Sequence, residues 1–93
     1  MKDQHTKIKG YRDLTQREID LMNAIKAKGL ELQTLVADVR QHLHDQREAA
    51  VAQEDEIKRI GAAEPGRWAS IGSTHFQEGL MALTRAVAQP GTY

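Results

Sequence analysis

The fold of this chain is decided by residues 14–43, LTQREIDLMNAIKAKGLELQTLVADVRQHL. Thr15 and Glu18 have the spacing of a capping box, in which each side chain accepts a hydrogen bond from the backbone N–H of the other residue. Leu14 and Ile19 occupy the two hydrophobic-staple positions around that box. A helix is therefore expected to begin at Thr15.

An apolar seam follows this start at spacings that alternate between three and four residues. Its members are Met22, Ile25, Gly29, Leu32, Val36, Val39 and Leu43. This heptad pattern is typical of a helix that packs lengthwise on other helices. Gly29 lies on the seam, which favours close approach of another backbone, but the sequence leaves a kink at Gly29 open.

The seam weakens after Leu43 and resumes only at Ile57 and Ile60, before glycine and proline end the helix. We expect a first helix over residues 15–61, and the sequence leaves its continuity across 44–60 open. The N-terminal residues 1–14 lack periodicity and predict a short arm or a single helical turn.

A second helix is expected over residues 65–89, because Pro65 suits a first helical position and Pro90 cannot continue a helix. Gly72 and Gly79 are seven residues apart and share one stripe, which predicts tight helix contact. The apolar positions are Trp68, Ile71, Phe76, Leu80, Leu83 and Val87.

These elements predict an all-α fold, a long antiparallel helical hairpin with a short N-terminal arm or helix, forming a single domain over residues 1–93. Only 40% of the residues are apolar and there is no cysteine, so neither a large core nor a disulfide stabilises the chain. A two-helix hairpin encloses no core of its own. We therefore expect the hairpins to assemble into a symmetric oligomeric helical bundle.

The charge distribution argues against a general binder of DNA or RNA. Residues 1–30 hold seven Lys/Arg and four Asp/Glu, residues 31–64 hold four and eight, and the net charge of the whole chain is zero. A nucleic-acid binder usually carries a large basic surplus, whereas this pattern fits a small anion held at a local cationic spot. No apolar run is long enough to cross a membrane and no signal-peptide pattern is present, so a cytoplasmic protein is expected.

Two side chains near the start of the first helix are candidates for ligand binding. Tyr11 lies between cations and beside Gly10, where its ring could stack on a nucleobase, although packing is the more frequent role of a tyrosine. Lys26 follows Ile25 at a position that flanks the seam and borders a neighbouring subunit. It could contact a ligand phosphate, although a partner carboxylate is its usual neighbour.

The second helix carries a third candidate group on one of its faces. Arg67, Ser70 and Thr74 are spaced i, i+3 and i+7, and Arg67 lies in the first turn, where the helix dipole disfavours a cation. A phosphate bound at this helix end would resolve that conflict. The other interpretation is a solvated face on which Arg67 reaches Glu64.

Neither catalysis nor metal binding is expected. No nucleophile–base arrangement and no glycine-rich phosphate loop occurs in the sequence. Asp38 and His42 are four residues apart, but no third ligand accompanies them, and His44 points to another helix face.

Two blocks, one at each end of the chain, resemble the phage anti-CBASS cyclic-nucleotide sponge proteins, and the hairpin domain of anti-Thoeris sponges is similar. The N-terminal block comprises residues 8–12, Leu14, Thr15, Glu18, Asn23, Ile25 and Lys26. The C-terminal block comprises Arg67, Trp68, Thr74, Gln77, Gly79, Met81, Leu83, residues 85–87 and Pro90. Together they span almost the whole chain, apart from a variable acidic middle.

The resemblance implies a non-enzymatic sponge without a cofactor, a helical hairpin assembled into a homohexamer. Such a protein sequesters cyclic dinucleotide and cyclic trinucleotide immune signals in an infected bacterial cell, so that the effector stays inactive. It implies that dinucleotides bind between subunits and trinucleotides in separate pockets.

Site residues follow from the same resemblance. It implies that Tyr11 stacks on a base and Lys26 contacts a phosphate of a dinucleotide, with Gly10 and Arg12 beside them. For the trinucleotide pocket it implies Arg67 and Thr74, with Ser70 or Ser73 as alternatives to Thr74. The competing hypothesis is a structural adaptor that binds another protein through its seam.

Overall fold

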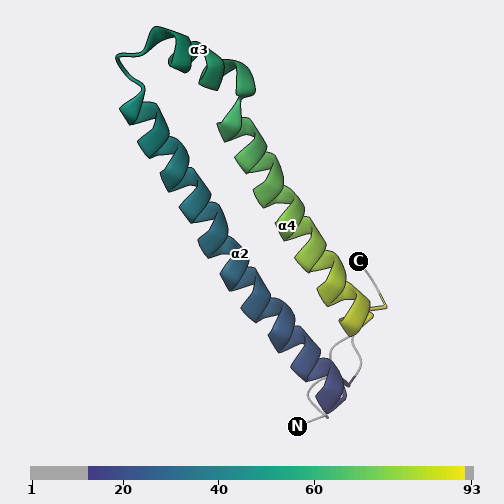
Figure 1. The fold of residues 1–93 in the computed structure, drawn as a ribbon. Helices are drawn as coiled ribbons and strands as arrows, with labels where there is room; N and C mark the ends of the chain where they lie inside the picture. The colour runs from purple at the N-terminus through teal and green to yellow at the C-terminus, as the bar shows by residue number, and fades with distance from the viewer. Residues whose placement is uncertain (1–12, 92–93) are drawn as a thin grey trace. The chain divides into compact units, whose positions relative to one another are not determined.

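The computed structural model describes residues 13–91, which form three helices and no strand. They are α2 (Gln16–Ala49), α3 (Glu54–Ala63) and α4 (Pro65–Ala88), shown in Figure 1. The all-α prediction is confirmed, and the helices form a hairpin-like arrangement. Most of the expected N-terminal arm lies outside the described residues.

The start of α2 is the predicted capping box. The backbone N–H of Thr15 donates to Glu18 Oε1 at 2.8 Å, and the backbone N–H of Glu18 donates to Thr15 Oγ1 at 3.2 Å. These two bonds satisfy donors that a helix end otherwise leaves without a partner. The helix therefore begins one residue after Thr15, at Gln16.

The chain divides into two compact units, which are described separately. Unit 1 contains α2 up to Leu30 and α4 from Gln77, and unit 2 contains residues Glu31–Phe76. In unit 1, a Cβ added at Gly29 would lie 3.3 Å from Leu80 Cδ1, which is a close approach. The helix runs unbroken through Gly29, so this glycine marks the predicted helix contact.

The predicted seam is the less exposed face of α2. Six of its seven members are half-buried, and Val39 is the more exposed exception. On α4 the predicted apolar face needs correction, because Trp68 and Leu83 are exposed. The half-buried positions of this helix include Ala69, Ser73 and Thr84. The tight contact expected at Gly72 and Gly79 is also wrong for the single chain, since a Cβ added at either would meet nothing within 4 Å among the described residues.

The helix expected over residues 15–61 is divided, because α2 ends at Ala49 and α3 begins at Glu54. The turn between them has backbone hydrogen bonds from Ala50 to Gln46 and from Gln53 to Ala50, at 3.1 and 2.8 Å. No glycine or proline marks this turn. Ala50 lies in this turn and is 3% exposed, and Ile60 of α3 is 5% exposed, so the break accompanies the burial of two apolar side chains.

Helix α3 is a short acidic helix. Its first turn carries Glu54, Asp55 and Glu56, whose charges suit the positive end of the helix dipole. Lys58 lies 3.4 Å from Glu54, and Arg59 pairs with Glu56. The guanidinium of Arg59 donates hydrogen bonds to the Glu56 carboxylate and so holds the pKa of that carboxyl below its ordinary value.

Few side chains of the described residues are fully buried. Among residues 13–91, Ala50 and Ile60 are the buried apolar residues, and several large apolar side chains are exposed. So small a core among residues 13–91 leaves apolar surface that association of several copies would cover. The symmetric bundle that the sequence predicts remains a prediction.

Candidate functional site

A residue with a left-handed backbone conformation joins α3 to α4 in unit 2. Glu64 has φ 50° and ψ 52°, and its backbone N–H donates to the carbonyl oxygens of Ile60 and Gly61 at 3.2 and 3.3 Å. This conformation closes α3 and lets α4 begin at Pro65. Glycine or asparagine usually occupies such a position, so glutamate is an unusual choice of side chain here.

Arg67 lies in the first turn of α4 and has two neighbours. Its Nη2 atom is 3.3 Å from Glu64 Oε2, and its guanidinium carbon lies 4.7 Å from the centroid of the Trp68 ring. The ion pair that the sequence offered as one interpretation of Arg67 is therefore formed. Both partners are about half exposed, so the pair is weak and open to exchange.

Ser70 lies three residues after Arg67 on the same face of α4 and contacts α2. Arg40 of α2 donates a hydrogen bond from Nη2 to Ser70 Oγ at 3.4 Å, and both residues are exposed. This bond is longer than a typical N–H···O bond, so it positions the guanidinium only loosely. A second cation thus joins the face that carries Arg67.

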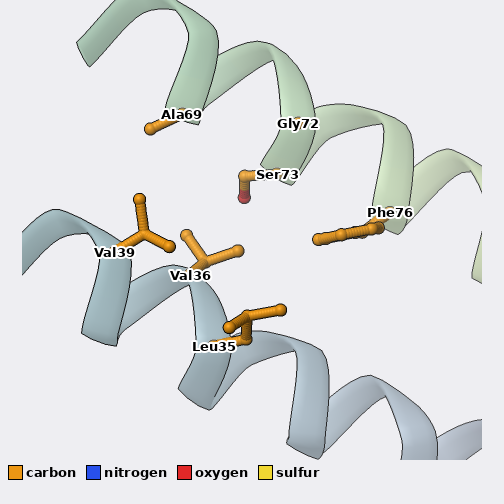
Figure 2. Close-up of a pocket in the computed structure, with 7 residues that line it drawn as sticks. All are labelled: Leu35, Val36, Val39, Ala69, Gly72, Ser73 and Phe76. Carbon is orange, nitrogen blue, oxygen red and sulfur yellow. The ribbon is translucent and has the colours of Figure 1, made fainter. Parts of the chain in front are cut away.

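The other two hydroxyl groups that were candidates for ligand binding, those of Ser73 and Thr74, lie in different surroundings. Thr74 is exposed, whereas Ser73 is half-buried and lines an apolar groove between α2 and α4 within unit 2. Figure 2 shows Ser73 directed toward Val36 across this groove. The groove is lined by Leu35, Val36, Val39, Ala69, Gly72, Ser73 and Phe76. Ser70 and Thr74 therefore offer exposed hydroxyls, and Ser73 does not.

We call the exposed polar residues of this region the polar cluster. Its members are Arg40, Glu64, Arg67, Trp68, Ser70 and Thr74, all in unit 2. The cluster offers two guanidinium groups, two hydroxyls and one aromatic ring. Guanidinium and hydroxyl groups are donors suited to phosphate oxygens, and an exposed ring is suited to stacking.

The second predicted site is only partly described. Lys26 is exposed on α2 in unit 1 and pairs with no carboxylate among residues 13–91. Its neighbour Ile25 is half-buried, as a seam position should be. Gly10, Tyr11 and Arg12 lie outside the described residues, so their place beside Lys26 stays a prediction.

Sequence reasoning missed Arg40. Arg40 follows the seam residue Val39, just as Lys26 follows Ile25, and the two cations are two heptads apart. This repeated position beside the seam is the sequence feature that could have marked Arg40 as a candidate. Its contact with Ser70 could not be deduced, because the pairing of α2 with α4 depends on the break after Ala49.

No group of three or more His, Cys, Asp or Glu residues suited to hold a metal ion occurs among residues 13–91. Within the same range, no helix is both long enough and apolar enough to cross a membrane.

A family model and a phage protein both match this chain. Residues 3–58 match the Acb2/Tad1 hairpin domain, a range that includes Tyr11, Lys26 and Arg40. Anti-CBASS protein 2 of Pseudomonas phage JBD67 is 46% identical over an alignment of 105 positions, which covers 97% of each chain. The second match extends to α4 and its part of the polar cluster. The chain therefore belongs to the Acb2/Tad1 hairpin-domain family.

Proposed function

We propose that this chain is an anti-CBASS sponge, which sequesters cyclic dinucleotides and cyclic trinucleotides and thereby blocks bacterial anti-phage signalling. The observation that carries the proposal is its similarity to Anti-CBASS protein 2 over 97% of both chains. The sponge acts in the cytoplasm of the infected cell and binds its ligands without converting them.

Two kinds of pocket are proposed. Tyr11 stacks on a base of the dinucleotide and Lys26 contacts its phosphate, with Gly10 and Arg12 at the same place in the chain. The trinucleotide is bound by residues of the polar cluster, namely Arg67, Ser70 and Thr74. The exposed hydroxyls of Ser70 and Thr74 support their assignment over Ser73, which is directed into the apolar groove.

Self-assembly, as a homohexamer, completes the proposal. The groove in unit 2 leaves Leu35 51% exposed, and further large apolar side chains are exposed on both helices. Association of several copies would cover these surfaces and create crevices between subunits. The same groove is the observation that favours the competing function, a structural adaptor whose groove takes a helix of another protein.

The proposed function is tested by measuring whether the protein captures cyclic nucleotides and releases them unchanged. The purified protein is incubated with a panel of cyclic dinucleotides and trinucleotides, washed and heat-denatured, and the supernatant is analysed by liquid chromatography and mass spectrometry. A sponge releases the original cyclic nucleotides intact. Linear products would indicate an enzyme, and no capture of any member, together with a monomeric mass, would favour the adaptor.

A further inference from the structure

Arg40 pairs with no carboxylate among residues 13–91, unlike Arg59 and Arg67 of the same unit. Arg67 pairs with Glu64 and Arg59 pairs with Glu56, whereas the contact of Arg40 among the described residues is the neutral hydroxyl of Ser70. This unpaired guanidinium lies in the acidic middle of the sequence, where residues 31–64 hold twice as many Asp/Glu as Lys/Arg.

The contact with Ser70 leaves most of the donors of Arg40 free. A guanidinium has five N–H donors, and one is used in the 3.4 Å bond to Ser70 Oγ. In that bond the serine oxygen accepts, so its own hydroxyl hydrogen can be donated elsewhere. Arg40 and Ser70 together therefore present several donors from two helices to one region of solvent.

We infer that Arg40 is a further phosphate-binding residue of the polar cluster, acting with Ser70 on the phosphodiester groups of a cyclic trinucleotide. The inference rests on the proposed function. Ser70 is one turn from Arg67 on the same face of α4, so Arg40 adds a second guanidinium from the facing helix. Two guanidinium groups suit a ring that carries several phosphates, because each can hold one phosphate by paired hydrogen bonds.

The chain offers a matched control in Arg47. It lies one heptad beyond Arg40 on α2, carries the same charge and is also exposed, but it has no contact with Ser70. Arg40→Gln removes the guanidinium, and Arg40→Lys keeps the positive charge without the planar fork. Arg47→Gln removes the same charge at a place where only the general electrostatic field of the protein is altered.

Calorimetric titration with a cyclic trinucleotide and with a cyclic dinucleotide tests the inference on the full-length chain. Arg40→Gln should weaken trinucleotide binding by about tenfold or more, the range for loss of hydrogen bonds to a charged group. Arg40→Lys should retain part of the affinity. Arg47→Gln should stay within about twofold of the parent protein, and dinucleotide binding should be unchanged in all three variants.

The results separate this inference from the proposed function. If the parent protein captures trinucleotides and Arg40→Gln binds them equally well, the inference fails and the proposed function stands. An equal loss in Arg47→Gln, or an equal loss for both ligands, would also overturn it, because the effect would then be a general one. A parent protein that binds no cyclic nucleotide overturns both.

Discussion

At the scale of the residue, Glu64 and Arg67 show how a local backbone requirement affects a candidate site. Glu64 takes a left-handed conformation that favours glycine, yet its carboxylate reaches Arg67 at 3.3 Å. The ion pair with Arg67 offsets part of the conformational cost of a side chain at this position. The sequence suggested this ion pair, but not the backbone geometry.

The left-handed conformation predicts a difference between two substitutions at position 64. Both Glu64→Gly and Glu64→Ala remove the carboxylate, so the lost ion pair cancels when they are compared. Glu64→Gly should be more stable than Glu64→Ala by about 1 kcal/mol, because alanine has a Cβ and resists a positive φ. Urea unfolding followed by circular dichroism measures the difference. Equal stabilities would contradict the backbone geometry described for this residue.

Tyr11 provides the residue-scale test of the proposed dinucleotide pocket. Tyr11→Ala should weaken cyclic dinucleotide binding by roughly 1–3 kcal/mol, the contribution of stacking on one base, while trinucleotide binding is retained. Isothermal titration calorimetry gives both affinities. The chain has a second tyrosine, Tyr93, outside the motifs of the family resemblance, so Tyr93→Ala is the matched control. Unchanged dinucleotide affinity in Tyr11→Ala would remove this residue from the site.

At the scale of the element, α3 determines which residues of α2 and α4 meet. If the first helix ran to residue 61 and turned back directly, Arg40 would face roughly position 86 of the second helix, as expected for antiparallel helices with a short connection. In the structure, Arg40 instead bonds to Ser70. The short helix thus shifts the pairing so that the polar cluster forms.

The sequence predicted those features that depend on local chemistry. The capping box at Thr15, the half-buried seam of α2 and the start of α4 at Pro65 follow from residue type and spacing alone. The break after Ala49 could not be predicted in this way, because no helix-breaking residue is present and the burial of Ile60 is a tertiary effect. The contact of Arg40 with Ser70 follows from that break, and so it was missed as well.

The buried side chain of α3 predicts a loss of stability when it is shortened. Ile60→Ala should lower the free energy of unfolding by about 2–5 kcal/mol, because it removes buried methyl groups and leaves a cavity. Ile60→Val, a milder change, should cost about 0.5–1.5 kcal/mol. Val51 lies in the preceding turn and is 78% exposed, so Val51→Ala is the control and should change stability little. Urea titration of the three variants checks this, and similar losses for Ile60→Ala and Val51→Ala would refute the packing of α3.

At the scale of the whole molecule, the described part of the chain leaves much of its apolar surface exposed. Two residues within 13–91 are buried apolar residues, while Leu30, Leu35, Met81 and other large apolar side chains are exposed. This exposed apolar surface supports the proposed assembly of several copies.

If other copies of the chain cover the groove, a charge placed there should lower the molecular mass of the assembly in solution. Leu35→Lys places a charge on the rim of the groove and should reduce the assembled mass, because burying an unpaired ammonium group between subunits is unfavourable. Gln33→Lys introduces the same charge at an exposed polar position of α2 and should leave the mass unchanged. Size-exclusion chromatography with light scattering measures both. A parent protein that is already monomeric would contradict the expected bundle.

The pairing of Arg67 with Glu64 has a consequence for ligand discrimination. A phosphate that reaches Arg67 meets a guanidinium whose charge is already partly balanced by a carboxylate 3.3 Å away. A nucleotide with a single phosphate would therefore gain little from this contact alone. In the proposed sponge, a messenger with several phosphates would make further contacts elsewhere in the cluster, which would let the protein ignore the abundant mononucleotides of the cell.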